Sequence, residues 1–233
     1  MELSVGQRPR ARIPVVATHV DGPSERHLNL MDRAGGRVSI YLDVPVILDA
    51  REPTALARLL DASSRARAVV LDLSQRSRDS IDAVADIGVP IWTDLHDYDG
   101  HSSFHAPFLH AASFVFLNGD RLDNPRDFLT SCVDGGAQVA VCTLGAQGAV
   151  AMNRGQDIVH VPAVPVVDVV DSNGAGDGFM AGFMAAYLDG ADVAHAMRSG
   201  ADQAARALGT VQLSPLLEQS DGSIRNTPNP FGE

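Results

Sequence analysis

The sequence of 233 residues has little cysteine and no long apolar run. Its two cysteines, Cys132 and Cys142, belong to no Cys-x-x-Cys pair and to no His/Cys cluster, so we interpret both as reduced, buried side chains. Residues 1–16 hold no apolar run of signal-peptide length, and no segment is long enough to span a membrane. We therefore expect a cytoplasmic protein with no membrane partner.

Positive charge is also scarce. The 18 Lys and Arg residues stand against 29 Asp and Glu residues, which gives a formal net charge of −11. Binding to a nucleic-acid backbone needs a basic surface, so this balance argues against a nucleic-acid partner. It does not argue against a nucleotide, because backbone amides can hold one. With 45% hydrophobic and 20% charged residues, the composition is that of an ordinary globular protein.

Two kinds of catalytic centre find little support in the sequence. No Gly-x-Ser-x-Gly nucleophile elbow occurs, which argues against a serine hydrolase. His96, His101, His105 and His110 gather near Asp94, and the spacings of Asp94-x-His96 and His101-x3-His105 would suit a metal ion. No cysteine joins them, and the segment follows an expected strand. We therefore favour a polar loop over a metal site.

Short apolar runs alternate with helical patterns along most of the chain. Strands buried on both faces are expected at residues 68–73, 89–94, 113–118 and 138–143, and helices at 53–67, 77–87, 124–135, 176–188 and 193–208. A further buried strand is expected at 166–170, and a hairpin of 148–152 with 157–161. Strands that alternate with helices predict an α/β fold with a mostly parallel sheet and right-handed crossovers.

The two ends of the chain differ from this pattern. Residues 37–42 alternate polar and apolar side chains after the turn signal Gly35-Gly36, so residues 27–42 are expected to form a hairpin. Residues 218–233 are polar and rich in Pro, Gly, Asn and Ser, which predicts a disordered tail.

Four of the expected strands end in a polar residue. These residues are Asp72, Asp94, Asn118 and Thr143. Ligands of open α/β sheets bind beyond the carboxyl ends of the strands, so these side chains mark one edge of the sheet as a candidate site. Taken singly, each is also explained as the point where a strand stops.

The most informative stretch is Asp171-Ser172-Asn173-Gly174-Ala175-Gly176-Asp177, which precedes a helical pattern. Gly174, Ala175 and Gly176 leave the backbone open to close approach, and the first amides of a helix bind anions. A carboxylate at Asp177 is placed to take the proton from a hydroxyl while those amides stabilise a transferring phosphoryl group. The residues alone leave a second interpretation equally open, in which Asp177 only caps the helix.

This stretch resembles the D-T-x-G-A-G-D signature of the ribokinase-like, PfkB-type carbohydrate kinases, and Phe179–Phe183 resembles the helix that follows it. Three other stretches agree in order and spacing. Residues 143–148 are similar to the T-L-G-x-x-G turn, residues 92–95 to the D-x-N strand end, and residues 30–42 to the lid strands. The resemblance covers residues 13–217 and implies a three-layer α/β/α sandwich with a mostly parallel central sheet and a small partial β lid.

The resemblance also implies a function. It indicates an ATP-dependent phosphotransferase that acts, with Mg²⁺, on a hydroxyl of a sugar or sugar-like small molecule. A nucleoside kinase and a catalytically impaired relative that binds nucleotide without turnover are the two alternatives.

Roles follow position by position from the same resemblance. Asp177 would be the catalytic base, and Gly174, Ala175 and Gly176 the anion hole. Asn118, Thr143, Gly145 and Gly148 would lie on the ATP side and Asp94 on the substrate side, while Asp171 and Asn173 would hold a monovalent cation such as K⁺.

The chain departs from the family pattern at two places. Arg121 stands where the N-x-x-E motif of the family has Glu. Three explanations are open. Asp120 or Asp123 supplies the missing carboxylate, Arg121 binds phosphate directly, or the site has decayed. Family members also carry about seventy to one hundred residues before the matching region, a segment comparable to a small domain. We expect this chain to lack them, with part of the sugar site, and a homodimer is one expected consequence.

The expected domains are a partial β lid at 13–47, an α/β nucleotide-binding core at 48–217 and the tail at 218–233.

Overall fold

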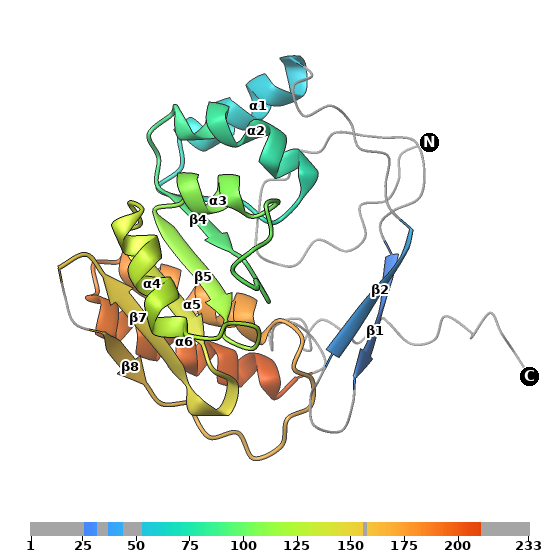
Figure 1. The fold of residues 1–233 in the computed structure, drawn as a ribbon, viewed down its shortest axis with the longest axis vertical. Helices are drawn as coiled ribbons and strands as arrows, with labels where there is room; N and C mark the ends of the chain where they lie inside the picture. The colour runs from blue at the N-terminus through green and yellow to red at the C-terminus, as the bar shows by residue number, and fades with distance from the viewer. Residues whose placement is uncertain (1–25, 32–36, 44–52, 156–157, 211–233) are drawn as a thin grey trace, which may run out of the picture.

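The computed structural model describes residues 26–31, 37–43, 53–155 and 158–210. These residues form a six-stranded sheet, flanked by helices, and a separate two-stranded sheet (Figure 1). The strands are β1 (Arg26–Met31), β2 (Arg37–Asp43), β3 (Val69–Val70), β4 (Ile91–Asp94), β5 (Phe114–Asn118), β6 (Val139–Thr143), β7 (Ala149–Asn153) and β8 (Val159–Val161). The helices are α1 (Pro53–Ser64), α2 (Gln75–Ala85), α3 (Ala106–Ala111), α4 (Pro125–Asp134), the single turn η1 (Gly145–Gln147), α5 (Ala175–Leu188) and α6 (Val193–Leu208).

The large sheet runs in the order β3-β4-β5-β6-β7-β8. Strands β3 to β6 are parallel, and β7 and β8 continue the sheet as antiparallel strands. Parallel strands end at the same edge of the sheet. Asn118 therefore lies beside Thr143 in register, and Asp94 pairs with Phe116, two residues before Asn118 on β5. The expected hairpin of β7 and β8 is confirmed, and so is the mostly parallel sheet.

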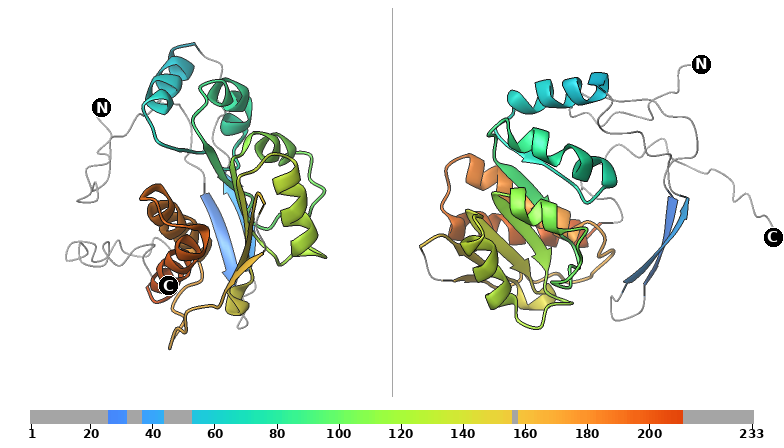
Figure 2. Two further views of the ribbon diagram at one scale, coloured as in Figure 1. Left: turned by 90° about the vertical axis from the view of Figure 1, so that its left-hand side faces the viewer. Right: turned by 45° about the horizontal axis from the view of Figure 1, so that its top comes forward.

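Helices cover both faces of this sheet and make a three-layer α/β/α sandwich (Figure 2). One buried cluster joins Val115 and Leu117 to α2, α3 and α4, and the partly buried Leu59 and Leu60 of α1 pack against it. The other cluster joins Trp92 and Phe114 to α5 and α6. Side chains of β4 and β5 alternate between the two faces of the sheet and so pack into both clusters, as expected for strands buried on both faces.

Aromatic side chains hold α5 against the sheet. The rings of Trp92 on β4 and Phe114 on β5 stack with 3.8 Å between centroids, and Phe183 of α5 meets Trp92 edge to face at 5.9 Å. Trp92, Phe114 and Phe183 are all at most 2% exposed. Ring pairs of this kind add stability beyond their buried area, so the position of α5 on the sheet is firmly set.

Two expected strands differ from the structure. β3 is only two residues long, and Val70 is 52% exposed, whereas residues 68–73 were expected to be buried on both faces. The strand expected at 166–170 is wrong, because these residues are extended loop and Val167 is 98% exposed. The backbone N–H groups of Val170 and Asp171 donate to the carbonyl of Leu208 at the end of α6, not to a neighbouring strand. Apolar residues alone do not make a strand without a strand to pair with.

The two-stranded sheet confirms the hairpin expected at residues 27–42. β1 and β2 pair antiparallel, with Leu28 opposite Ile40, and Arg26 forms an ion pair with Asp43. The hairpin stands apart from the three layers, on the side toward which β4 and β5 run (Figure 1). The division at residues 47 and 217 stays a prediction, and the tail at 218–233 lies outside the described residues.

Both cysteines are free and buried, as interpreted from the sequence. Burial raises the pKa of each thiol, Cys132 and Cys142, to about 12, so neither is a reactive thiolate near neutral pH. In the part of the chain that the structure describes, no helix combines the length and the apolar character needed to cross a bilayer.

Candidate functional site

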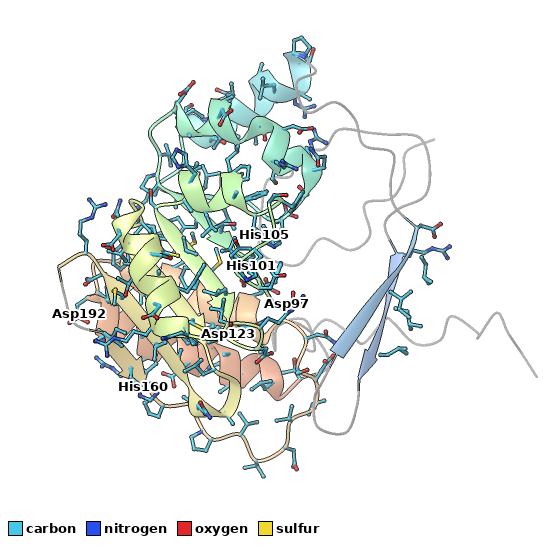
Figure 3. The ribbon with its side chains drawn as sticks, in the orientation of Figure 1. Asp97, His101, His105, Asp123, His160 and Asp192 are labelled. Atoms are coloured by element: carbon cyan, nitrogen blue, oxygen red, sulfur yellow. The ribbon has the colours of Figure 1, made fainter. Side chains whose placement is uncertain are left out.

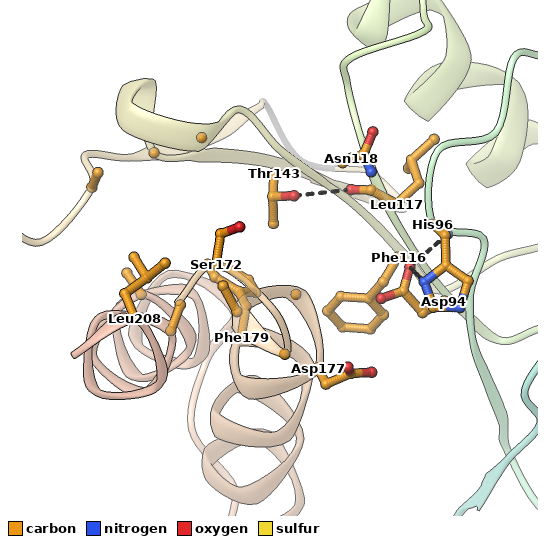
Figure 4. A pocket seen from close by; sticks show the side chains of 18 of the residues that line it. Asp94, His96, Phe116, Leu117, Asn118, Thr143, Ser172, Asp177, Phe179 and Leu208 are labelled. Atoms are coloured by element: carbon orange, nitrogen blue, oxygen red, sulfur yellow. Dashed lines mark hydrogen bonds and ion pairs between the residues drawn. The ribbon is translucent and has the colours of Figure 1, made fainter. Parts of the chain in front are cut away.

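A pocket of about 510 Å³ opens where the carboxyl ends of β4, β5 and β6 face the start of α5 (Figure 4). It brings together nine of the eleven residues singled out from the sequence: Asp94, Asn118, Thr143, Gly145, Gly148, Gly174, Ala175, Gly176 and Asp177. Asp171 and Asn173 do not line it. Three of the four polar strand ends predicted to mark this edge line the pocket, and the fourth, Asp72, does not.

The start of α5 forms one wall of this pocket. Gly174 is the N-cap, with a left-handed φ of 76° that suits glycine, and no side chain caps the helix. The N–H groups of the first turn have no partner inside the helix, so they are available to an anion in the pocket. Asp177 lies in that first turn, is exposed and lines the pocket. A carboxylate in the first turn also stabilises a helix N-terminus, so the choice between a capping and a catalytic role for Asp177 stays a prediction.

Asp94 faces α5 from the end of β4. One carboxylate oxygen, Oδ1, accepts the backbone N–H of His96 at 2.8 Å. The other, Oδ2, points at α5, since a Cβ built on Gly176 would lie 3.7 Å from it. Burial raises the pKa of Asp94, the adjacent His96 partly offsets the rise, and the charge of Asp177 adds to it. Asp94 and Asp177 therefore flank the same space, where one carboxylate influences the other.

His96 is a pocket residue that the sequence reasoning missed, since it was weighed only as a metal ligand. Its ring Nδ1 lies 3.9 Å from Oδ1 of Asp94, and its side chain is 50% exposed. Its backbone is left-handed, with φ of 53°, which costs a non-glycine residue roughly 1 kcal/mol. The usable signal was its place two residues after the polar end of β4.

The other side of the pocket is formed by the ends of β5 and β6. Asn118 accepts the backbone N–H of Asp120 at 3.2 Å, and Thr143 donates its hydroxyl hydrogen to the carbonyl of Leu117 at 3.4 Å. The turn after Thr143 packs closely on β8. A Cβ on Gly148, whose φ is 91°, would lie 2.0 Å from the carbonyl oxygen of Val161. This turn therefore tolerates only glycine at that position.

Arg121 does not reach the pocket. Its guanidinium lies 4.0 Å from Asp97 and 4.0 Å from Asp99, in the loop after β4. Backbone N–H groups of His101 and Ser102, and then Arg121, lower the pKa of Asp99. Of the two carboxylates considered as substitutes for glutamate, Asp120 lines the pocket and Asp123 does not.

The histidines of the loop after β4 do not converge on a metal site. Figure 3 shows His101 and His105 close together after β4, and His160 away from them on β8. Among the described residues, no group of three or more His, Cys, Asp or Glu side chains is placed to hold a metal ion. His105 packs on Tyr98 with 4.7 Å between ring centroids, and burial lowers its pKa, so it is best explained as a neutral packing residue.

Asp171 and Asn173 form a tight local turn beside the pocket. Oδ1 of Asp171 accepts both the backbone N–H and the side-chain amide of Asn173, each at 2.8 Å. These bonds fix the loop that leads into Gly174. Their expected role with a monovalent cation stays a prediction.

Known proteins share both the fold and this motif region. Residues 111–219 match the model of the pfkB family carbohydrate kinases. The chain is 30% identical over 195 residues to acarbose 7(IV)-phosphotransferase of an Actinoplanes species, a match that covers 82% of this chain and 64% of the relative.

Among solved structures, a microbiome-derived acarbose kinase superposes with a TM-score of 0.70 at 31% identity, covering 83% of this chain and 65% of that one. Arabidopsis thaliana ribokinase, solved with ribose and ATP, superposes with a TM-score of 0.62 at 20% identity over 86% of this chain and 70% of that one, which shows the fold alone.

The three layers and the order of the elements thus define a ribokinase-like α/β protein. Residues 111–219 carry the similarity to the pfkB family of carbohydrate kinases, and the chain is similar over more than four fifths of its length to the two acarbose kinases described above. It spans 64% of the length of the curated relative described above.

Proposed function

We propose that this chain provides the phosphoryl-transfer site of an ATP-dependent kinase that acts on a hydroxyl of a sugar or sugar-like molecule. The observation that carries the proposal is the meeting of three features in one pocket. These are the open amides at the start of α5, the carboxylate of Asp177 beside them, and the polar ends of β5 and β6 opposite. The names of the two acarbose kinases support a carbohydrate acceptor.

The chemistry follows from this arrangement. ATP lies along the ends of β5 and β6, near Asn118 and Thr143, with the turn of Gly145 and Gly148 beside it. The acceptor hydroxyl gives its proton to a carboxylate oxygen of Asp177 as its oxygen attacks the γ-phosphorus and the bond to the leaving ADP oxygen breaks. The amides of the first turn of α5 stabilise the negative charge on the transferring group.

A magnesium ion fits the donor set at the nucleotide end of the pocket. Asp120 and Asn118 offer a carboxylate and an amide oxygen, the oxygen ligands that Mg²⁺ accepts along with water. Magnesium supplies charge neutralisation on the phosphates. We further propose that Asp94, on the opposite side, orients the acceptor hydroxyl, and that Asp171 and Asn173 are the candidates for a monovalent cation.

A second candidate function is nucleotide binding without turnover. It is motivated by Arg121, which pairs with Asp97 and Asp99 instead of lining the pocket. The same pocket would then hold ATP with no acceptor placed against Asp177.

One experiment separates the two candidates. The purified chain is titrated with ATP and Mg²⁺ by calorimetry and then incubated with both and with a panel of oligosaccharides, monosaccharides and nucleosides. Mass spectrometry then detects phosphorylated products. Product from a carbohydrate supports the kinase, and product from nucleosides alone moves the substrate class to nucleosides. ATP binding with no product across the panel supports the binding function, and no ATP binding contradicts both.

A further inference from the structure

Most of the ionisable side chains that line the pocket are acidic. Asp94, Asp97, Asp120 and Asp177 line it, whereas His96 is the single lining side chain, among the residues that the structure describes, that can carry a positive charge. The whole sequence contains no lysine, so all 18 of its Lys and Arg residues are arginines. A phosphate group entering this pocket therefore has few side-chain donors to meet.

His96 is held between the two halves of the site. Its backbone N–H donates to Oδ1 of Asp94 at 2.8 Å, on the side that faces α5. Its carbonyl accepts the backbone N–H of Asn118 at 2.9 Å, on the side of β5 and β6. Figure 4 shows the imidazole beside Asp94, with Asp177 across the pocket.

The left-handed backbone conformation of His96 costs free energy. It is the one non-glycine residue with a left-handed φ among the described residues, and its ring remains half-exposed instead of filling a core. Left-handed backbone at non-glycine residues often occurs at binding sites, where the surrounding structure imposes it. Here the backbone of His96 is hydrogen-bonded to Asp94 on one side and to Asn118 on the other, and His96 lines the pocket.

We propose that His96 contacts the terminal phosphoryl group of ATP and donates a ring N–H hydrogen bond to one of its non-bridging oxygens. The inference rests on the proposed function, since it needs ATP in this pocket. A neutral imidazole with the proton on the nitrogen that faces the phosphate is sufficient, and a charged one strengthens the bond. With the amides of α5, His96 is then the protein group that recognises the γ-phosphate.

The test compares nucleotides that differ by one phosphate. Calorimetry measures the affinity of the full chain and of His96→Asn for ATP and for ADP, each with Mg²⁺. Asparagine tolerates left-handed backbone, so this variant removes the ring and keeps the loop. His101→Asn is the matched control, because His101 is an exposed residue of the same loop that does not line the pocket. His96→Gly provides a second variant whose backbone adopts this φ freely.

We expect both His96 variants to bind ATP about tenfold more weakly, as for the loss of one hydrogen bond to a charged group, with ADP affinity changed less than about twofold. His101→Asn should change neither affinity. Equal losses for ATP and ADP, or no loss for ATP, would overturn the role of His96 and leave the kinase proposal standing. Failure of the unaltered chain to bind ATP would instead overturn the proposed function itself.

Discussion

The pocket edge of the large sheet and the β1–β2 hairpin differ in how far their apolar side chains are buried. The strands that end at the pocket lie between two cores, and Trp92, Phe114 and Val141 are at most 2% exposed. The hairpin pairs only with itself, and four of its apolar side chains are 44–60% exposed: Leu28, Leu30, Ile40 and Leu42. A hairpin of two strands is marginal alone. The pocket edge of the large sheet is thus supported by its own cores, whereas the hairpin exposes an apolar face that another surface could cover.

The exposed side chains of the hairpin lie together on one face. Leu28 is opposite Ile40 in register, and Leu30 and Leu42 are each two residues further along their strands. Such a face is suited to close over a ligand or against another surface. The homodimer expected from the sequence is one such arrangement and stays a prediction.

The largest difference between the two regions should appear on truncation of a core aromatic. Trp92→Ala is expected to lower the free energy of unfolding by about 3–5 kcal/mol, because it removes the ring that joins β4 to α5. Urea denaturation measures the change. Trp92→Phe is the control and should lose much less, since the indole N–H has no acceptor in the described part of the chain. Equal losses in both variants would show that the stacked ring does not hold α5 in place.

Gly148→Ala tests the turn between β6 and β7, which we propose lies beside ATP. The added Cβ meets the carbonyl of Val161, and the φ of 91° is unfavourable for alanine, so we expect a loss of about 2–3 kcal/mol and weaker ATP binding. Gly155→Ala is a matched control, because Gly155 has a φ of 80° and open space around its Cβ position. Thermal unfolding and ATP titration of both variants separate steric overlap from backbone strain. A Gly148→Ala variant no less stable than Gly155→Ala would contradict the close packing on β8.

Asp94→Asn tests the buried carboxylate. Because the pKa of Asp94 is raised in the folded state, the folded protein binds its proton more tightly than the unfolded chain does. Stability is therefore lost as the pH rises from the ordinary value of 3.8 through the raised pKa. Asp94→Asn should remove this loss and therefore be more stable than the unaltered protein at pH 7.

Denaturant unfolding between pH 4 and pH 7 checks this expectation. Asp202→Asn, at an exposed position on α6, is the control and should leave the pH dependence unchanged. A stability profile for Asp94→Asn parallel to that of the unaltered protein would refute the burial argument.

The smallest effect is expected in the hairpin. Replacement of Leu28 and Leu42 by serine should change the free energy of unfolding of the large sheet by less than about 0.5 kcal/mol, because both side chains are largely exposed. Hydrogen exchange of β5 and β6 amides measures this core directly. A marked loss of protection in those strands would show that the hairpin supports the core after all.

Much of the site was predictable because it depends on local rules. The glycine-rich stretch 171–177 does lead into a helix, which begins at Ala175, and the polar ends of β4, β5 and β6 do meet at one pocket. Both follow from helix start signals and from parallel strands that end at the same edge. The catalytic and binding roles assigned to these residues stay predictions.

The remainder depends on neighbours that a linear pattern does not contain. Residues 166–170 have the composition of a strand, but their backbone donors are taken by Leu208. β3 is short and partly exposed because it is the outermost strand of the described sheet. His96 was weighed only as a metal ligand, because its left-handed φ and the hydrogen bond between its carbonyl and Asn118 of β5 appear only in the folded chain.

The most direct test of the account is phosphoryl transfer by Asp177→Asn. Product formation from ATP is measured with the acceptor that the panel identifies, beside Asp168→Asn, an exposed carboxylate outside the pocket. The account predicts that Asp177→Asn is slower by about 10²–10⁴-fold with ATP affinity retained, and that Asp168→Asn matches the unaltered chain. Turnover of Asp177→Asn equal to that of the unaltered chain would contradict the assignment of this pocket as a phosphoryl-transfer site.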